Sequence, residues 1–287
     1  MKQNLPNLLI PGYHKSGTTT LFNELSKHSD ICPSIIKEPF YFRPFINGKK
    51  LPPLKDYKKY FRNASNERYL MDGSPTYIYG GKRAAEIIQK TLGNVKIIIC
   101  LRDPVNQLFS LYKHHLRFMK CNENETFLSF VQRKNDFSKQ FYDEHLKEWF
   151  RVFGDDIKCI FFEQFIETPN VVLADIYNWL GISPLLIENR QLINANPGKM
   201  FRFASLHSIS LKLFKLIKNK ISNDTFILFR KIYFNINGKE AHHSLTKDAK
   251  LILEPIFYPH LRELKTTLKL QEYQNMPKWL STINDKE

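Results

Sequence analysis

A loop rich in hydroxyl and amide donors lies close to the start of the chain. Residues 11–20 have the sequence Pro-Gly-Tyr-His-Lys-Ser-Gly-Thr-Thr-Thr. The apolar run 7–10 before it predicts a buried strand, and residues 18–28 after it predict a helix. A strand, a glycine turn and a helix N-terminus together present several backbone N–H groups to one anion. We therefore predict an anion site formed by Lys15, Ser16, Gly17, Thr18, Thr19 and Thr20.

The position of the lysine separates this loop from the nucleotide triphosphatase loop. In the motif G-x-x-x-x-G-K-[ST] the lysine follows the last glycine, and the next hydroxyl holds magnesium. Here Lys15 precedes Gly17, so its ammonium is expected beside the far end of a short phosphoryl donor and not along a triphosphate. A P-loop kinase is an alternative that this residue order disfavours.

A second cation follows the clearest buried strand, which we predict over residues 95–101. Arg102 lies just past its end, where open α/β sheets bind their ligands. Pro104 opens a predicted helix over 105–118, and Ser110 lies two turns further on. An arginine and a serine suit a second phosphate. The alternative is a structural ion pair between Arg102 and Asp103 or another carboxylate.

Strand-like and helical runs alternate through most of the chain, which predicts an α/β fold with a central, mainly parallel sheet flanked by helices. The predicted strands lie at 7–10, 31–36, 69–71, 95–101 and 157–162, and the predicted helices at 18–28, 82–92, 105–118, 145–153 and 171–180. Residues from about 199 to 287 form a predicted helical C-terminal third, with a closing helix over 247–270 broken or kinked at Pro255 and Pro259. We expect one domain over residues 1–287.

Composition narrows the class of partner. The 287 residues carry a formal charge of +15, which favours nucleotides, nucleic acid, acidic glycans or a membrane surface as partners. No apolar run approaches the length of a membrane span, and a strand follows Met1 too closely for a signal peptide. The four cysteines are too far apart to suggest a zinc site or a disulfide framework. We expect a cytoplasmic protein without a metal.

Three motifs together resemble the sulfotransferases that use 3′-phosphoadenylyl sulfate (PAPS). They are Lys15 to Thr19, the triplet Lys37-Glu38-Pro39, and Arg102 through Ser110. The likeness is greatest to the branch that acts on heparan and related glycans and to its bacterial relatives. It covers nearly the whole chain, because the Gly238-Lys239 loop and Trp279 also have counterparts. The resemblance implies a P-loop-like sulfotransferase fold.

The resemblance also implies roles for the donor side. The loop from Lys15 to Thr19 would bind the 5′-phosphosulfate, and Lys15 would stabilise the bridging oxygen as the sulfuryl group departs. Arg102 and Ser110 would bind the 3′-phosphate. Lys239 matches a position that closes over the nucleotide.

Several residues are candidates for the base on the acceptor side. Glu38 matches the catalytic base of the glycan branch, and His14, His114 and His115 are the other candidate bases. Sulfuryl transfer needs a base at the acceptor hydroxyl and a cation at the leaving oxygen, and protein cations can supply the latter without a metal. The glycan branch commonly has a lysine where this chain has Gly73, so a second active-site cation is missing there. Asp72 then contributes to the acceptor site or caps the turn.

The basic segment 199–239 is predicted to be amphipathic and helical, with its apolar face in the core. Its alternatives are a docking surface for an acidic acceptor or for lipid headgroups. The leading function is sulfuryl transfer from PAPS to a hydroxyl, expected on a saccharide. The other interpretations are sulfation of a small natural product at a hydroxyl or amine, a kinase, and a nucleic-acid-binding module.

Overall fold

The computed structural model describes residues 4–117, 125–134, 136–185 and 245–284, with short stretches at 200–201, 210, 232–233, 236 and 238–239. The chain divides into two compact units. The first comprises Met1–Gln107, Asp136–Ala195 and Ile252–Glu287, and the second comprises Leu108–Asn135 and Asn196–Leu251. Most of the basic segment 199–239, the pair His242-His243 and Cys121 lie outside the described residues.

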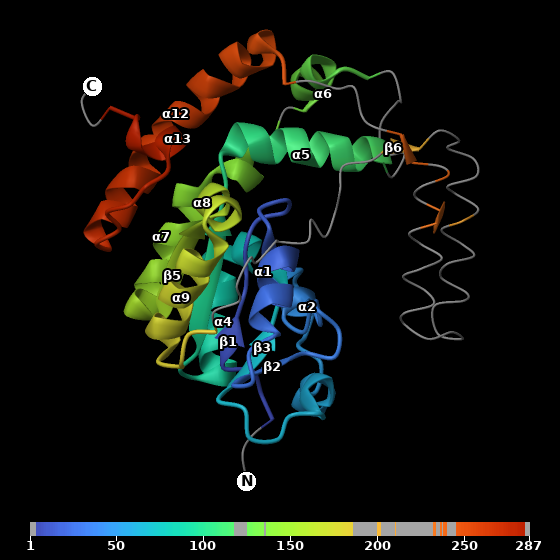
Figure 1. The fold of residues 1–287 in the computed structure, drawn as a ribbon, viewed down its shortest axis with the longest axis vertical. Coiled ribbons are helices and arrows are strands. Elements are labelled where there is room, and N and C mark those ends of the chain that lie inside the picture. Colours follow the sequence, from blue (N-terminus) through green and yellow to red (C-terminus); the bar gives the residue numbers. More distant parts are fainter. Residues whose placement is uncertain are drawn as a thin grey trace. The chain divides into compact units, whose positions relative to one another are not determined.

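A five-stranded sheet forms the centre of the first unit. Its strands are β1 (Leu8–Leu9), β2 (Ile31–Pro33), β3 (Tyr69–Asp72), β4 (Lys96–Leu101) and β5 (Ile157–Phe161). They lie in the order β2-β3-β1-β4-β5, and every neighbouring pair is parallel (Figure 1). Leu9 is in register with Asp72 on one side and with Ile97 on the other. The predicted parallel sheet is thus confirmed.

Helices connect the strands close to the predicted positions. The longer ones are α1 (Thr18–Leu25), α4 (Gly81–Leu92), α5 (Pro104–Arg117), α7 (Tyr142–Phe153), α9 (Pro169–Leu180) and α12 (Lys247–Leu270). The short ones are α2 (Arg43–Ile46), α3 (Leu54–Lys58), α6 (Phe127–Arg133), α8 (Phe162–Glu167) and α13 (Lys278–Ser281). Gly181 ends α9 in the left-handed conformation, with a φ of 67°. Of the break or kink expected in the closing helix, the break is wrong, since α12 continues through Pro255 and Pro259, and the kink stays a prediction.

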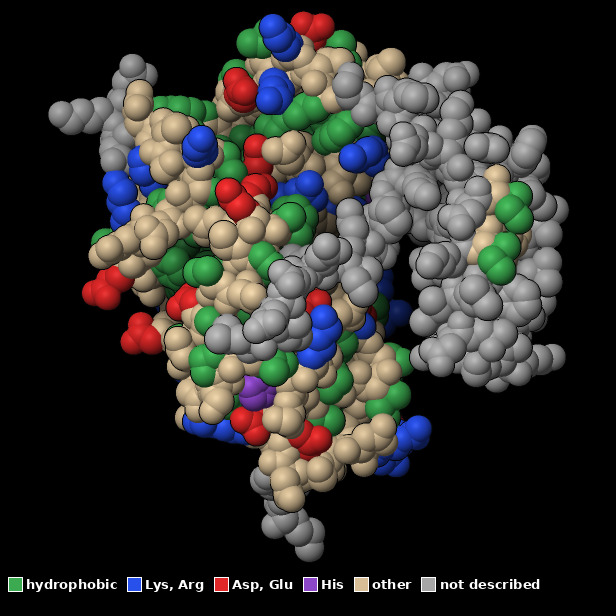
Figure 2. Space-filling model, in the orientation of Figure 1, with side chains coloured by type: hydrophobic (Ala, Val, Ile, Leu, Met, Phe, Trp, Pro, Cys, Tyr) green, Lys and Arg blue, Asp and Glu red, His purple; other side chains and the backbone are tan. Residues whose placement is uncertain are grey.

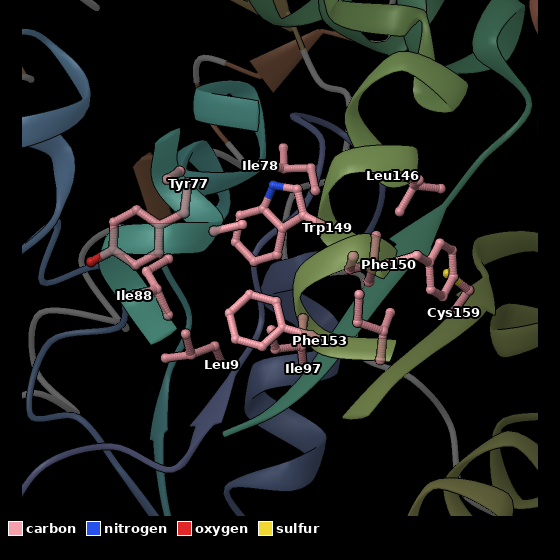
Figure 3. Packing of buried hydrophobic residues seen from close by; sticks show 14 of the residues in the cluster. Leu9, Tyr77, Ile78, Ile88, Ile97, Leu146, Trp149, Phe150, Phe153 and Cys159 are labelled. Carbon is pink, nitrogen blue, oxygen red and sulfur yellow. The ribbon is translucent and has the colours of Figure 1, made fainter. Parts of the chain in front are cut away.

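Alternate residues of the strands point to opposite faces of the sheet, and both faces are buried. Leu9, Ile97 and Ile99 pack with α4 and α7, where Trp149 is the largest fully buried side chain (Figure 3). Leu8, Ile98 and Cys100 belong to a second cluster with α1 and α9. Burial on both faces is typical of parallel sheets. Ligands of such sheets bind outside the carboxyl ends of the strands.

The order of the strands places a crevice at a particular point of that edge. From β1 the chain passes through α1 to β2 at one side of the sheet, whereas from β4 it passes to β5 at the other side. The connections after β1 and β4 thus diverge between two adjacent strands. Ligands of open α/β sheets bind at such a switch point, outside the carboxyl ends of the strands.

The described part of the second unit contains aromatic packing and a short ladder. The ring of Phe109 lies 5.0 Å from that of Phe127, and Tyr112 lies 5.4 Å from Phe130. Strands β6 (Met200–Phe201) and β7 (Gly238–Lys239) pair antiparallel, with Met200 opposite Lys239. None of the described helices is long and apolar enough to cross a membrane.

Candidate active site

The loop after β1 forms the centre of the site. Lys15 has a φ of 69° and Gly17 a φ of 87°, so the loop turns sharply before α1 begins at Thr18. Gly17 occupies the N-cap of α1, no side chain caps that helix, and its first turn holds no acidic residue. The positive end of the helix dipole and the first backbone N–H groups of α1 therefore suit an anion. The structure places the six predicted loop residues together here.

Glycine is required at position 17 for two reasons. Its φ lies in the left-handed region that side chains rarely adopt. A Cβ atom built there would lie 2.5 Å from Cδ2 of Phe162. The ring of Phe162, just past the end of β5, thus packs directly beneath the loop.

Arg102 joins β4 to the loop. Its Nη1 donates a hydrogen bond of 2.8 Å to the carbonyl oxygen of Lys15, and its guanidinium carbon lies 4.3 Å from the centre of the Phe162 ring. Gln107 adds a second bond to the loop, from Nε2 to the carbonyl oxygen of His14 at 2.6 Å. The alternative of an ion pair between Arg102 and Asp103 is not formed among the described residues. Asp103 instead accepts from the N–H of Val105 at 2.8 Å, at the start of α5.

Buried polar atoms beside the loop lack partners within the described residues. They are Nε of Arg102 and Oε1 of Gln107. The buried hydroxyls of Ser16 and Tyr142 face each other: burial raises the pKa of Tyr142 well above its usual value, and a hydrogen bond with the Ser16 side chain opposes the rise. Buried polar groups in native proteins nearly always have a hydrogen-bond partner. Arg102 Nε can donate to an anion, so it fits a phosphorylated ligand at the loop.

Burial also makes the charged form of the Arg102 guanidinium less favourable. Desolvation lowers the pKa of the Arg102 guanidinium, and the carboxylate of Glu163 acts in the opposite direction. Glu163 is itself held at both oxygens: the N–H of Asp103 donates to Oε1 at 3.2 Å, and Nε1 of Trp279 donates to Oε2 at 3.1 Å. A bound anion would stabilise the charged guanidinium further.

Glu38 and its neighbours lie beyond the carboxyl ends of β2 and β3. Oε1 of Glu38 accepts from Nζ of Lys37 at 2.8 Å. The same Nζ donates to the carbonyl oxygen of Gly73 at 3.1 Å, and the N–H of Gly73 donates to the carbonyl oxygen of Lys37 at 3.1 Å. The side chain of Glu38 is 35% exposed and that of Lys37 is 18% exposed. The carboxylate is thus accessible, and the ammonium beside it is largely enclosed.

His14 provides the electrostatic link between the loop and Glu38. The backbone N–H of His14 donates to the Tyr79 hydroxyl at 3.0 Å, and the rings of His14 and Tyr79 lie 5.6 Å apart. Desolvation lowers the pKa of His14 although the residue has exposed surface. The charge of Glu38 raises this pKa, whereas Lys139, Lys15 and Lys37 lower it. The imidazole therefore lies within the field of both the loop lysine and the candidate base.

Asp72 is buried at the end of β3, and its carboxylate accepts hydrogen bonds from neighbouring residues, so it acts as a structural residue. Its carboxylate accepts from the Tyr57 hydroxyl at 2.6 Å, the Tyr77 hydroxyl at 3.1 Å and the Ser74 N–H at 2.8 Å. Burial raises the pKa of Asp72, and these hydrogen bonds oppose the rise. Of the two roles that the sequence left open for Asp72, the structure favours the turn cap.

The remaining predicted residues belong to the second unit. Ser110, His114 and His115 lie on α5 beyond Gln107, and Lys239 lies in β7. The structure brings Lys15, Arg102, Glu38 and His14 to one edge of the sheet in the first unit. Sequence reasoning missed Phe162 and Gln107. The signal for Phe162 was its place directly after a buried strand.

The described part of the chain contains no cluster of three or more histidine, cysteine or acidic side chains placed to hold a metal ion. Cys32, Cys100 and Cys159 are free and buried, as expected of small hydrophobic residues.

Known proteins share both the sequence pattern and the fold. The membrane-associated sulfotransferase kil1 of Dictyostelium discoideum is 34% identical over 124 residues, which cover 42% of this chain and 25% of that protein. The heparan sulfate glucosamine 3-O-sulfotransferase 3B1 of Homo sapiens is 26% identical over 209 residues, covering 68% of this chain and 51% of that one. The chain thus spans between about a quarter and a half of the length of these relatives.

A solved structure and a family model agree with this likeness. The crystal structure of a sulfotransferase from Alicyclobacillus acidocaldarius is 19% identical, with a TM-score of 0.67, and covers 96% of this chain and 98% of its own. This likeness confirms the predicted fold. The family model of the Sulfotransferase domain matches residues 5–227. Since this match covers more than half of the chain, the protein belongs to the sulfotransferase family.

Proposed function

We propose that this protein transfers a sulfuryl group from PAPS to an acceptor hydroxyl. The observation that carries the proposal is the junction of Lys15 and Arg102 across the ends of β1 and β4, with the buried donor Nε of Arg102 left without a partner among the described residues. Two cationic positions next to one helix N-terminus suit a nucleotide with phosphates at both ends.

The donor would be held mainly by backbone and buried groups. The N–H groups at the start of α1 and the Ser16 hydroxyl would bind the 5′-phosphosulfate, and Arg102 with Ser110 would bind the 3′-phosphate. The resemblance gives Lys239 a role in closing over the nucleotide. PAPS itself supplies the sulfuryl group. Lys15, whose backbone is fixed by Arg102 at 2.8 Å, would stabilise the charge that grows on the leaving oxygen.

Glu38 would act as the general base at the acceptor. Its carboxylate is accessible and lies in the field that also reaches His14 beside Lys15. An ionised carboxylate can take the proton of an acceptor hydroxyl as that oxygen bonds to sulfur. The acceptor would thus approach from the β2–β3 side of the edge, opposite the 3′-phosphate.

A saccharide is the acceptor that the relatives support, because the heparan sulfate sulfotransferases among them are named for glycan acceptors. A small natural product is the alternative. On the face shown in Figure 2, the Lys and Arg side chains of the described residues are interspersed with Asp and Glu. Among the described residues on this face, no patch of a single charge sign supports the interpretation as a nucleic-acid-binding module.

The test has two steps. First, the thermal unfolding of the protein is measured with adenosine 3′,5′-bisphosphate (PAP), the product of the donor; we expect stabilisation at millimolar ligand without magnesium. Second, sulfur-labelled PAPS is offered with a set of glycans and hydroxylated metabolites. The donor assignment is wrong if PAP leaves the melting temperature unchanged. Stabilisation by ATP with magnesium alone would favour a kinase, and salt-sensitive binding of DNA or RNA that ignores PAP would favour a nucleic-acid module.

A further inference from the structure

The ammonium of Lys37 is fixed more firmly than is usual for a surface lysine. It contacts Oε1 of Glu38 at 2.8 Å and the carbonyl oxygen of Gly73 at 3.1 Å, and it lies 6.0 Å from the centre of the Phe22 ring. Lys37 lies in a bend of the chain, where its side chain can meet that of the next residue. The Gly73 carbonyl gives the ammonium a second anchor.

Gly73 packs closely against the ring of Phe22 and the backbone of Lys37. A Cβ atom at Gly73 would lie 2.6 Å from Cδ2 of Phe22 and 3.1 Å from the carbonyl oxygen of Lys37. A side chain at this position would thus push against the Phe22 ring and against the backbone of Lys37. The two backbone segments approach closely only because residue 73 is glycine. The same approach lets the ammonium of Lys37 reach across to the carbonyl.

We propose that Lys37 is a positioning residue for sulfuryl transfer: it holds the Glu38 carboxylate in a fixed orientation by joining it to the carbonyl oxygen of Gly73. This inference rests on the proposed function of Glu38 as the base. Its role would differ from that of Lys15, which lies on the donor side of the loop after β1.

The chemical step requires a carboxylate in a fixed place. As the acceptor oxygen bonds to sulfur, the bond from sulfur to the 5′-phosphate oxygen breaks, and its electron pair leaves on the phosphate. The acceptor proton passes to Glu38. A carboxylate tied to the Lys37 ammonium, and through it to the Gly73 carbonyl, keeps one orientation for that transfer.

The experiment compares Lys37→Met with Lys59→Met. The control removes a lysine from an exposed ion pair with Asp56, in which the two atoms lie 2.6 Å apart. For Lys37→Met we expect kcat to fall by about tenfold, because a Glu38 carboxylate without this anchor is less often oriented for proton transfer. Stabilisation by PAP should be the same in both variants and in the wild type. Lys37→Arg should recover most of the lost rate.

A second readout needs no acceptor. The side-chain order of Glu38 is measured by NMR relaxation in the protein without ligand, in the wild type and in Lys37→Met and Lys37→Gln. Lower order of the Glu38 side chain in both variants supports the inference. Unchanged order, or a kcat equal to that of Lys59→Met, overturns it. Failure of the wild type to bind PAP would instead refute the proposed function, and the relaxation measurement would still decide the role of Lys37.

Discussion

The two sides of the site are built in different ways. On the β4–β5 side, Arg102 and Gln107 donate to the backbone of the Lys15 loop, and the Phe162 ring packs under Gly17. On the β2–β3 side, Glu38 and Lys37 meet through side-chain contacts, and Glu38 is 35% exposed. The donor side is thus part of the fold, whereas the acceptor side is added to it. Substitutions on the donor side should alter donor binding, and also stability where they disturb the packing under the loop, whereas substitutions on the acceptor side should alter the chemistry alone.

Glu38→Gln gives the sharpest separation of the two sides. The amide cannot accept the acceptor proton, and it keeps the size of the side chain. We expect kcat to fall by about 10²- to 10⁴-fold, with an unchanged melting-temperature shift on adding PAP. Asp56→Asn, in an exposed ion pair, is the matched control and should keep full activity. A Glu38→Gln variant with wild-type turnover would remove Glu38 as the base.

Lys15→Ala should affect both rate and donor binding. The ammonium is lost from the leaving oxygen in the transition state, and from the phosphosulfate in the ground state. We expect a loss of about 10²- to 10³-fold in kcat/KM, together with a smaller thermal shift on adding PAP. The left-handed backbone at position 15 strains either side chain alike, so the stability without ligand should change little. If Lys15→Ala bound PAP as tightly as the wild type, the division between the two sides would not hold at this residue.

Gly17→Ala tests whether the donor side is part of the fold. The new Cβ would meet the Phe162 ring at 2.5 Å, in a backbone conformation with a φ of 87°. Such overpacking and backbone strain each cost about 1–3 kcal/mol. We expect a lower free energy of unfolding by urea denaturation and weaker PAP binding. Gly48→Ala is the control, since its φ is 81° and no atom lies within 4 Å of the built Cβ. Equal losses in the two variants would show that Phe162 does not restrict the loop.

The sequence predicted the donor side well because its signals are local. A strand, a glycine turn and a helix start within a few residues, and the apolar run before Arg102 identifies the next strand. The predicted strands lie within a few residues of those found. Phe162 could not be predicted as a partner of Gly17, because that contact depends on the sheet order, which joins β1 to β5 only through β4. The Gly73 contact with Lys37 was hidden for the same reason, since it links the ends of two different strands.

The closing helix shows where a local rule failed. Pro255 and Pro259 predicted an interruption, yet α12 runs from Lys247 to Leu270. Its buried residues include Leu253, Phe257, Leu264 and Leu268. Packing of this face stabilises the helix on both sides of the prolines, so tertiary contacts outweigh the loss of backbone hydrogen bonds.

The smallest expected change concerns His14, the alternative base in the loop. If Glu38 is the base, His14→Gln should lower kcat by less than about tenfold, far below the loss expected for removal of a general base. A loss equal to that of Glu38→Gln would instead assign the proton transfer to His14.

The field around His14 adds a test that does not depend on turnover. The carboxylate of Glu38 raises the pKa of His14 and the ammonium of Lys37 lowers it. NMR titration of the imidazole should therefore give a lower pKa in Glu38→Gln and a higher pKa in Lys37→Met, each relative to the wild type. Lys59→Met should leave it unchanged. Opposite shifts in the first two variants would place the acceptor-side pair within reach of the loop, because screening by solvent removes such effects over longer distances. Absence of both shifts would mean that the two sides of the site are electrostatically independent.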